Sequence, residues 1–420
     1  MSKEVSVLSG SPQRFRDLRF NVRNSVMNGA YGTMATGIVS TFVPLYMLDA
    51  LHANNQLIAL LNSLPALSAL LASIAGAFWV PRLAGYRLFS VVTFLLTRIS
   101  YLVMALVPWI SPAAATLVVE VNAAANFPQT LATLSWQALM AKLVPSALRE
   151  NFFGRRNAII TIVGLGGTIL TGGVLQLFNP HAKGPYEAFL VLAFLLGLVE
   201  VRYLARHREP PLGERPRPLR WDTWTQLWRV ASFRQYVIMA AFFNFGWQLS
   251  WPLFSIFQIN TAHATGLWIG IFTIATQATE ILTFRWWGKL AQRYGGLTIL
   301  GVSAIGVSLV PLLTVLSTNM LYLTAVSLFS GLSLSGVTLL LFTELLNAAP
   351  THERSGAIAF YNVILGGVAF VAPELGVFLL HILHMQGAML TSTIWRFAGG
   401  LFFITPVIKR SRRGKKEQAA

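Results

Sequence analysis

The feature that most constrains this chain is a series of apolar segments, each about 20 residues or longer, separated by polar gaps. A helix needs about 20 apolar residues to cross a bilayer, and its backbone groups must be hydrogen-bonded within the segment. We therefore predict an all-α membrane protein with twelve transmembrane helices. They are expected over residues 22–48, 56–80, 87–109, 113–141, 155–178, 186–205, 234–259, 266–288, 297–317, 320–347, 355–380 and 388–408.

The composition agrees with a chain that lies mostly in lipid. Only 11% of the 420 residues are charged, whereas soluble domains carry about 25%. The sequence lacks the alternating segments of about ten residues that mark a transmembrane β-barrel. It also lacks cysteine, which excludes disulfides and thiolate chemistry. The first 20 residues are polar and basic, so we expect no cleavable signal peptide. Together with the short loops, this favours the cytoplasmic membrane of a prokaryote.

The basic residues indicate the orientation. The formal net charge is +17, and 29 of the 32 lysines and arginines fall on one side of the membrane if the N-terminus is inside. Such an excess is typical of cytoplasmic segments. We therefore predict that both termini are cytoplasmic and that the charge faces anionic lipids of the inner leaflet. This distribution argues against nucleic acid as a partner.

The longest gap divides the predicted spans six and six. We expect an N-terminal bundle (1–205), a cytoplasmic linker (206–233), a C-terminal bundle (234–408) and a basic tail (409–420). The linker ends with three tryptophans at helical spacing, Trp221, Trp224 and Trp228. They predict a short helix on the inner membrane surface, or simply the beginning of the seventh span.

Weak matches between the two halves suggest an internal repeat. Pro44-Leu-Tyr46 in the first span matches Pro252-Leu-Phe254 in the seventh. In the loops after spans four and ten, three residue types recur 205 positions apart: Pro145 and Pro350, Arg149 and Arg354, Asn157 and Asn362. Because these matches occupy corresponding places, they predict two homologous six-helix halves.

The loop after span eight indicates a family. Its sequence, from Gly288 to Gly295, reads GKLAQRYG and resembles the G-x-L-A-D-R-x-G signature of the major facilitator superfamily, with Gln292 in place of the aspartate. The resemblance implies a secondary transporter in which two six-helix bundles expose a central cavity alternately to each side of the membrane. It also implies that spans one, four, seven and ten line the cavity most closely.

Polar side chains on two of these spans are candidates for the cavity lining, because a polar helix face in lipid must point at protein or water. Hydrogen bonding between helices is the alternative explanation for such stripes. The candidates are Asn122, Asn126, Gln129 and Thr133 in span four, and Asn244, Gln248, Trp251 and Ser255 in span seven.

Charged residues inside spans are costly and need partners or a function. The depths of Arg98 and Glu120 along their helices predict a structural ion pair, and the same argument predicts a pair of Glu374 with Arg396. Glu280 has no basic residue within one helical turn of it.

A buried, unpaired carboxyl can bind and release a proton near neutral pH, so Glu280 is our candidate for proton coupling or substrate binding. A neutral hydrogen-bonded carboxyl, or an ion pair with another helix, is the alternative. Thr273 and Gln277 share its helix face and are candidate lining residues.

Charges at the cytoplasmic ends of the spans suggest an inner gate. We predict a network of Arg82, Arg293, Glu344 and Arg354 that closes the cavity on the inside. An ordinary interfacial ion pair is the alternative.

These observations predict a transporter of a small organic solute. Proton-coupled efflux of amphiphilic, drug-like compounds is our leading hypothesis. Uptake of a neutral polar metabolite and a non-transporting membrane sensor are the alternatives. The sequence shows no phosphate-binding loop and no clustered nucleophile or metal ligands. We therefore expect no enzymatic activity, no cofactor and no metal site, and we expect a monomer whose partners are the solute, protons and lipid.

Overall fold

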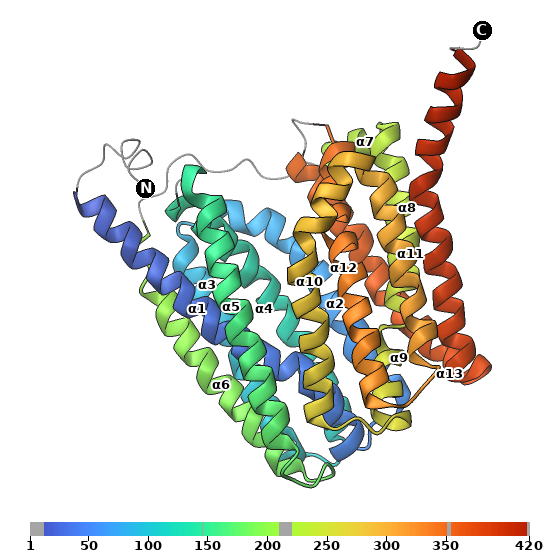
Figure 1. The fold of residues 1–420 in the computed structure, drawn as a ribbon. Helices are drawn as coiled ribbons and strands as arrows, with labels where there is room; N and C mark the ends of the chain where they lie inside the picture. Colours follow the sequence, from blue (N-terminus) through green and yellow to red (C-terminus); the bar gives the residue numbers. More distant parts are fainter. Residues whose placement is uncertain (1–11, 145, 210–220, 351–353, 418–420) are drawn as a thin grey trace.

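The computed structural model describes residues 12–144, 146–209, 221–350 and 354–417, and in these ranges every regular element is a helix or helical turn. The beginning of α1 and the end of α13 lie at the same end of the bundle (Figure 1). The first half contains α1 (Pro12–Leu45), the π-helical turn η1 (Tyr46–Ala50), α2 (Asn55–Trp79), the 3-10 turn η2 (Val80–Arg82), α3 (Tyr86–Ile110), α4 (Ala114–Leu143), α5 (Ser146–Leu175) and α6 (Lys183–Ala205). The remainder contains α7 (Trp221–Arg229), α8 (Ala231–Leu249), α9 (Trp251–Ile256), the π-helical turn η3 (Phe257–Thr261), α10 (Gly266–Tyr294), α11 (Gly296–Thr314), α12 (Met320–Ala348) and α13 (Arg354–Glu417).

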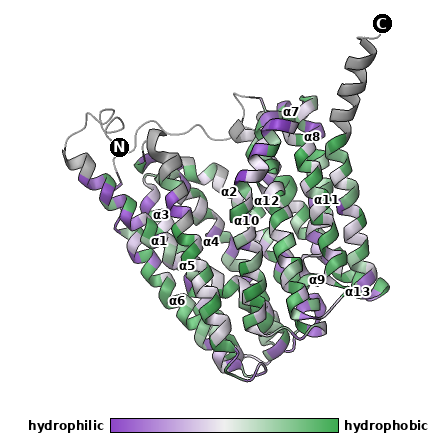
Figure 2. Ribbon diagram, in the orientation of Figure 1, coloured by the Kyte–Doolittle hydropathy of each residue, from purple (hydrophilic) through white to green (hydrophobic). Residues whose placement is uncertain are grey.

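Eight helices in the described ranges are long and apolar enough to cross a membrane. One of them, Gly356–Ile404, covers two of the predicted spans. Helices α1, α4 and α8 fall short of this threshold because polar side chains interrupt their apolar sequence. Hydrophobic residues run along the helices, and many hydrophilic residues lie near α7 and in the coloured part of α1 closest to the N label (Figure 2).

Most helices pack within their own half of the chain. In the first half, α1 packs on α5 and α6, α3 on α4 and α6, and α2 on α4. In the second half, α13 packs on α8 and α11, and α12 on α10 and α11. The main contacts between the halves are made by α2 with α13 and by α5 with α10. These two seams are therefore the main interfaces between the halves.

Two predicted spans differ from a continuous helix. The seventh span is broken at Ser250, which separates α8 from α9. Pro252 follows the break and has no backbone N–H to donate, so it cannot complete the helical hydrogen bonds there. The predicted spans eleven and twelve join in one element, α13, with a sharp bend at His384, whose φ is 59°.

The linker forms the separate helix α7, which ends just before Val230. Trp224 and Trp228 of α7 each contact the ring of Phe360 in α13, at centroid distances of 5.6 Å. The tryptophans therefore anchor α7 to the second half of the protein, and its position on the membrane surface stays a prediction.

Two similar turns support the predicted repeat, but they align the two halves with a different offset from the one that the sequence match gives. The turns η1 and η3 are each followed by a histidine with positive φ, His52 at 51° and His263 at 56°. Ala53 N–H donates to Met47 O and Ala264 N–H donates to Gln258 O, both at 2.8 Å. Tyr46 thus corresponds to Phe257 and not to Phe254. Phe257 lies about one helical turn after Phe254 in the chain.

Candidate solute-binding cavity

Three adjoining cavities lie between the helices. The inner cavity, of about 370 Å³, lies mostly within the first half and also contacts Gln277 of α10. The central cavity, of about 380 Å³, shares Thr36, Ser40 and Gln129 with the inner cavity. The tryptophan cavity, of about 300 Å³, shares Asn62 and Trp251 with the central cavity. Because neighbouring cavities share lining residues, we treat the three as one candidate site.

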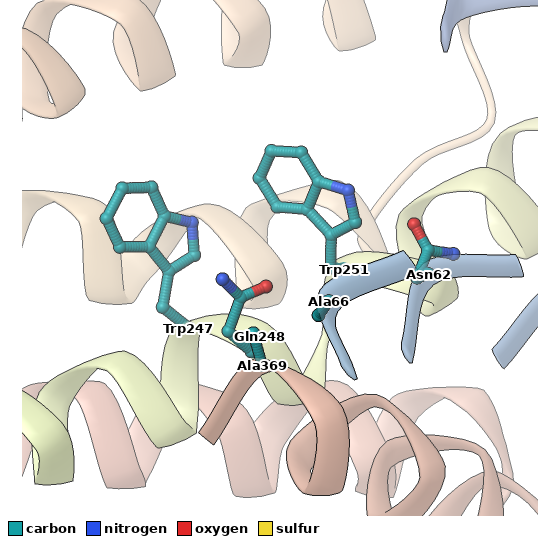
Figure 3. A pocket seen from close by; sticks show the side chains of 6 residues that line it. All are labelled: Asn62, Ala66, Trp247, Gln248, Trp251 and Ala369. Carbon is teal, nitrogen blue, oxygen red and sulfur yellow. The ribbon is translucent and has the colours of Figure 1, made fainter. Parts of the chain in front are cut away.

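Most of the predicted lining residues reach these cavities. The central cavity contains Asn122, Asn126, Gln129 and Trp251, and the inner cavity contains Gln129, Thr133 and Gln277. The tryptophan cavity contains Gln248 and Trp251, and Figure 3 shows the rings of Trp247 and Trp251 projecting beside Gln248. Asn244, Ser255 and Thr273 are not among the residues that line these three cavities.

A stripe on α1 contributes to the site and was missed from the sequence. Asn28, Gly32, Thr36 and Ser40 line the inner cavity, and Asn21, Asn24 and Ser25 continue the same stripe as buried residues. Their spacing of three or four residues is the signal that could have revealed the stripe. The small side chains let α1 approach α5 and α6 closely while still presenting hydroxyl and amide groups to the cavity.

The predicted pair of Arg98 with Glu120 is wrong. Arg98 Nε lies 2.7 Å from Glu200 Oε2, and both side chains are buried, whereas Glu120 is exposed. Arg98 also donates to the hydroxyl of Tyr101 at 2.5 Å. Depth along two helices does not show which neighbour a side chain faces, and α3 packs on α6 as well as on α4. Glu200 of α6 is the actual partner of Arg98.

Glycines make room for the charged groups of the inner cavity. A Cβ atom on Gly197 would lie 2.5 Å from Arg98 Cδ, and one on Gly29 would lie 2.5 Å from Arg156 Nη2. A Cβ atom on Gly32 would overlap the carboxylate of Glu200. Contacts this close are incompatible with a side chain larger than hydrogen unless the charged groups move.

The predicted pair of Arg396 with Glu374 is also wrong. Arg396 is 1% exposed and donates to the carbonyl oxygens of Gly246 at 3.2 Å, Trp247 at 3.0 Å and Val307 at 3.2 Å, and to the hydroxyl of Ser250. The break between α8 and α9 leaves the first two carbonyls without their usual helical partners. The guanidinium group therefore satisfies the broken backbone of the seventh span and does not need a carboxylate.

Glu374 instead joins the two halves of the protein. Its carboxylate accepts hydrogen bonds from Gln56 Nε2 and Ser63 Oγ, both at 2.5 Å. Gln56 lies in the first turn of α2, and Glu374 lies on α13, so these bonds cross the seam between α2 and α13. They hold the halves together near the beginning of α2.

Glu280 of α10 is half-buried and lies one turn from Gln277 of the inner cavity. Thr338 Oγ1 donates to Glu280 Oε1 at 3.4 Å. Among the described residues, no lysine or arginine forms an ion pair with this carboxylate. Its surroundings therefore agree with a carboxyl group that has no fixed counter-charge.

Of the candidate gate residues, the three with described side chains, Arg82, Arg293 and Glu344, form no ion pair with one another. Arg82 is exposed, Arg293 stacks on Tyr294 at 5.2 Å, and Glu344 accepts a hydrogen bond from Asn347 at 3.2 Å. The side chain of Arg354 lies outside the described residues. The predicted network belongs to a state that is closed at this end, and it stays a prediction.

Comparisons with known proteins agree with this geometry. The family model of the Major Facilitator Superfamily matches residues 27–373. A crystal structure of the nucleoside transporter NupG superposes with a TM-score of 0.72 at 13% sequence identity, covering 92% of this chain and 98% of that one. The human organic anion transporter MFSD10 gives a TM-score of 0.61 at 13% identity, with coverages of 94% and 100%. A bacterial homologue of the human lysosomal transporter Spinster, in an inward-facing and occupied conformation, gives a TM-score of 0.64 at 13% sequence identity. The match covers 94% of this chain and 97% of that one.

No curated protein matches the sequence. At such low identities the structural neighbours establish the fold alone, and the family model supplies the assignment. The family and its neighbours agree with the helices that are long and apolar enough to cross a membrane. The chain belongs to the Major Facilitator Superfamily and is an integral membrane transporter, not an enzyme.

Proposed function

We propose that this transporter moves a small polar organic solute across the membrane by alternating access, with the three adjoining cavities as its binding site. The observation that carries the proposal is the lining of this site. Amides from α2, α4, α8 and α10 face hydroxyls from α1 and the rings of Trp247 and Trp251. Amides and hydroxyls bind polar groups with defined geometry, and an indole ring gives a flat surface for a planar group.

The two halves, residues 1–205 and 234–408, act as the moving bodies in this proposal. The hydrogen bonds of Glu374 with Gln56 and Ser63 support a state closed near the beginning of α2. The inner cavity is lined at the other end by Arg156, near the cytoplasmic end assigned by the basic residues. We therefore assign the conformation as closed outside, with the linker and both termini in the cytoplasm.

The substrate class follows from the charges in the site. Glu200 is neutralised by Arg98, so the inner cavity offers no free carboxylate to a lipophilic cation. This favours a polar solute with a planar group over a cationic drug. Efflux of amphiphilic compounds remains the second candidate, because Trp251 is 47% exposed and offers a large apolar surface beside the cavity.

A ligand screen tests the proposal. Purified protein is heated with nucleosides, sugars, amino acids, aromatic acids and lipophilic cations, and each stabilising compound is then tested for flux in reconstituted vesicles. A ligand at one hundred times its Kd stabilises a protein by about 2.7 kcal/mol. We expect polar compounds with a planar ring to stabilise the protein and to cross the membrane. Stabilisation without flux would support the sensor alternative instead.

We further propose that Glu280 couples transport to protons. Replacing Glu280 by glutamine keeps the size of the side chain and removes its ability to exchange a proton. We expect Glu280→Gln to abolish flux driven by a pH gradient while leaving exchange of solute between two equally buffered sides. Both rates are measured with radiolabelled solute in vesicles.

The control for this prediction is Glu120→Gln, which removes an exposed carboxyl from α4. We expect this variant to retain both activities. Gradient-driven flux at the normal rate in Glu280→Gln would exclude Glu280 from the coupling mechanism.

A further inference from the structure

The inner cavity contains one more basic group than acidic group. Arg98, Arg156 and Glu200 all line it, and all three are buried, with exposed fractions of 1%, 8% and 4%. Glu200 forms its ion pair with Arg98, at 2.7 Å. Arg156 is attracted by the same carboxylate, but a single negative charge balances only one of the two cations.

Arg156 is held in place without a carboxylate of its own. Its Nε donates to the carbonyl oxygen of Ser25 at 3.1 Å, and its Cζ lies 4.5 Å from the ring centroid of Trp136. Among the described residues, no acidic side chain forms an ion pair with Arg156. A buried guanidinium is costly unless its N–H groups are paired or hydrogen-bonded. Arg396 donates from all three of its nitrogens, whereas among the described residues only the Nε of Arg156 has a hydrogen-bond partner. Gly29 provides the space that the guanidinium of Arg156 occupies.

Two neutral groups of the same cavity also lack partners. Trp136 Nε1 and Gln129 Oε1 are buried and form no hydrogen bond, and both residues line the inner cavity. A buried polar atom without a partner costs about 1–3 kcal/mol. One atom is a donor beside the guanidinium of Arg156, and the other is an acceptor. The guanidinium of Arg156 and the indole N–H of Trp136 can both donate to an anionic group of a ligand, and Gln129 Oε1 can accept from a donor group of the same ligand.

We infer that the inner cavity binds the carboxylate group of a monoanionic organic solute. The carboxylate accepts hydrogen bonds from the guanidinium of Arg156 and from the indole N–H of Trp136, and Gln129 accepts one from a hydroxyl or amide of the solute. The planar fork of a guanidinium group matches a carboxylate. One uncompensated positive charge fits a monoanion better than a phosphate group with nearly two charges. This inference rests on the proposed transport function and narrows its substrate class.

Matched acids and amides test the inference on the full chain in detergent. The probes are phenylacetate, 4-hydroxyphenylacetate and indole-3-acetate, each compared with its primary amide by isothermal titration calorimetry. We expect the carboxylates to bind at least ten times more tightly than the amides. In Arg156→Gln, we expect the affinity for the carboxylates to fall at least tenfold and the affinity for the amides to stay unchanged. Arg156→Lys keeps the positive charge but loses the planar guanidinium group. It should therefore retain part of the preference for the carboxylates over the amides.

The neighbouring residue provides the control. Arg155 is exposed and lies outside the inner cavity, so Arg155→Gln removes the same charge from the chain without altering the site. We expect it to bind all probes like the unmodified protein. Thermal unfolding without ligand shows whether each variant is folded, and if Arg156→Gln is not, the comparison is made with Arg156→Lys alone.

Three results would overturn the inference: equal affinities for acids and amides, no binding of any acid, or the same loss in Arg155→Gln as in Arg156→Gln. The transport proposal fails separately. It is overturned if no solute of any class crosses the membrane of reconstituted vesicles. If a neutral solute crosses the membrane at the same rate in Arg156→Gln as in the unmodified protein, only the carboxylate assignment is overturned.

Discussion

Replacing Glu200 by glutamine is expected to destabilise the folded protein by about 3–5 kcal/mol, which is the cost of breaking a buried ion pair by removing one partner. The variant leaves Arg98 buried with an exposed fraction of 1% and without its carboxylate. It also leaves Arg156 without the negative charge that attracts it. The free energy of unfolding is measured by denaturant titration in mixed micelles.

The matched control is Glu120→Gln. Glu120 was the partner of Arg98 predicted from the sequence, but it is exposed in the structure. Its replacement should change stability by less than about 0.5 kcal/mol, as surface substitutions usually do. A larger loss in Glu120→Gln than in Glu200→Gln would restore the original pairing and contradict the geometry of α3 and α6.

A double variant separates the charge from the packing. In Arg98→Met with Glu200→Leu, both charges disappear and apolar side chains of similar size fill the space. Such replacements of a buried pair are often neutral or stabilising, so we expect stability to recover at least to that of the unmodified protein. If the double variant is as stable as the unmodified protein but does not transport, the pair has a role in solute binding or conformational change besides holding α3 against α6.

The helices and the polar stripes could be predicted because each depends on local sequence. Length and apolar content locate a membrane helix. The spacing of Asn122, Asn126 and Gln129 predicts that they share one helix face, and all three line the central cavity. The stripe of α1 has the same spacing, but its glycines and serines give a weaker polar signal.

The partners of the buried charges depended on three-dimensional packing. Arg98 lies on α3, which packs on both α4 and α6, and the contact of α3 with α6 brings Glu200 within reach. Arg396 binds carbonyl groups that exist as free acceptors only because the chain breaks at Ser250. No pattern of residues along one helix contains that information, so charge pairs inferred from depth alone were wrong in both cases.

The second large effect is expected at Gly172, where the two halves are in close contact along α5 and α10. A Cβ atom at Gly172 would lie 2.6 Å from the carbonyl oxygen of Gly266 and 3.2 Å from the Cα of Leu267. Both are backbone atoms, which cannot rotate away from the contact. Gly172 lies near the end of α5, and Gly266 begins α10, so the contact belongs to the end of the bundle that we assign to the outside.

Gly172→Ala can relieve this overlap only if α5 and α10 separate. We therefore expect the variant to favour the state that is open to the outside and to lose most of its transport, because the closed state must form in every cycle. Gly173→Ala is the control, since a Cβ atom there would have no atom within 4 Å. It adds the same methyl group one residue away and should behave like the unmodified protein.

Because the sequence contains no cysteine, a single introduced thiol can report the shift of Gly172→Ala toward the state that is open to the outside. A single Asn62→Cys substitution places one thiol at the junction of the central and tryptophan cavities. A membrane-impermeant maleimide added outside right-side-out vesicles should label it at least ten times faster in Gly172→Ala, which corresponds to a shift of about 1.4 kcal/mol between the two states. Equal labelling rates in Gly172→Ala and Gly173→Ala would show that the contact between α5 and α10 does not control closure. The outer gate would then depend on Glu374 and the seam between α2 and α13.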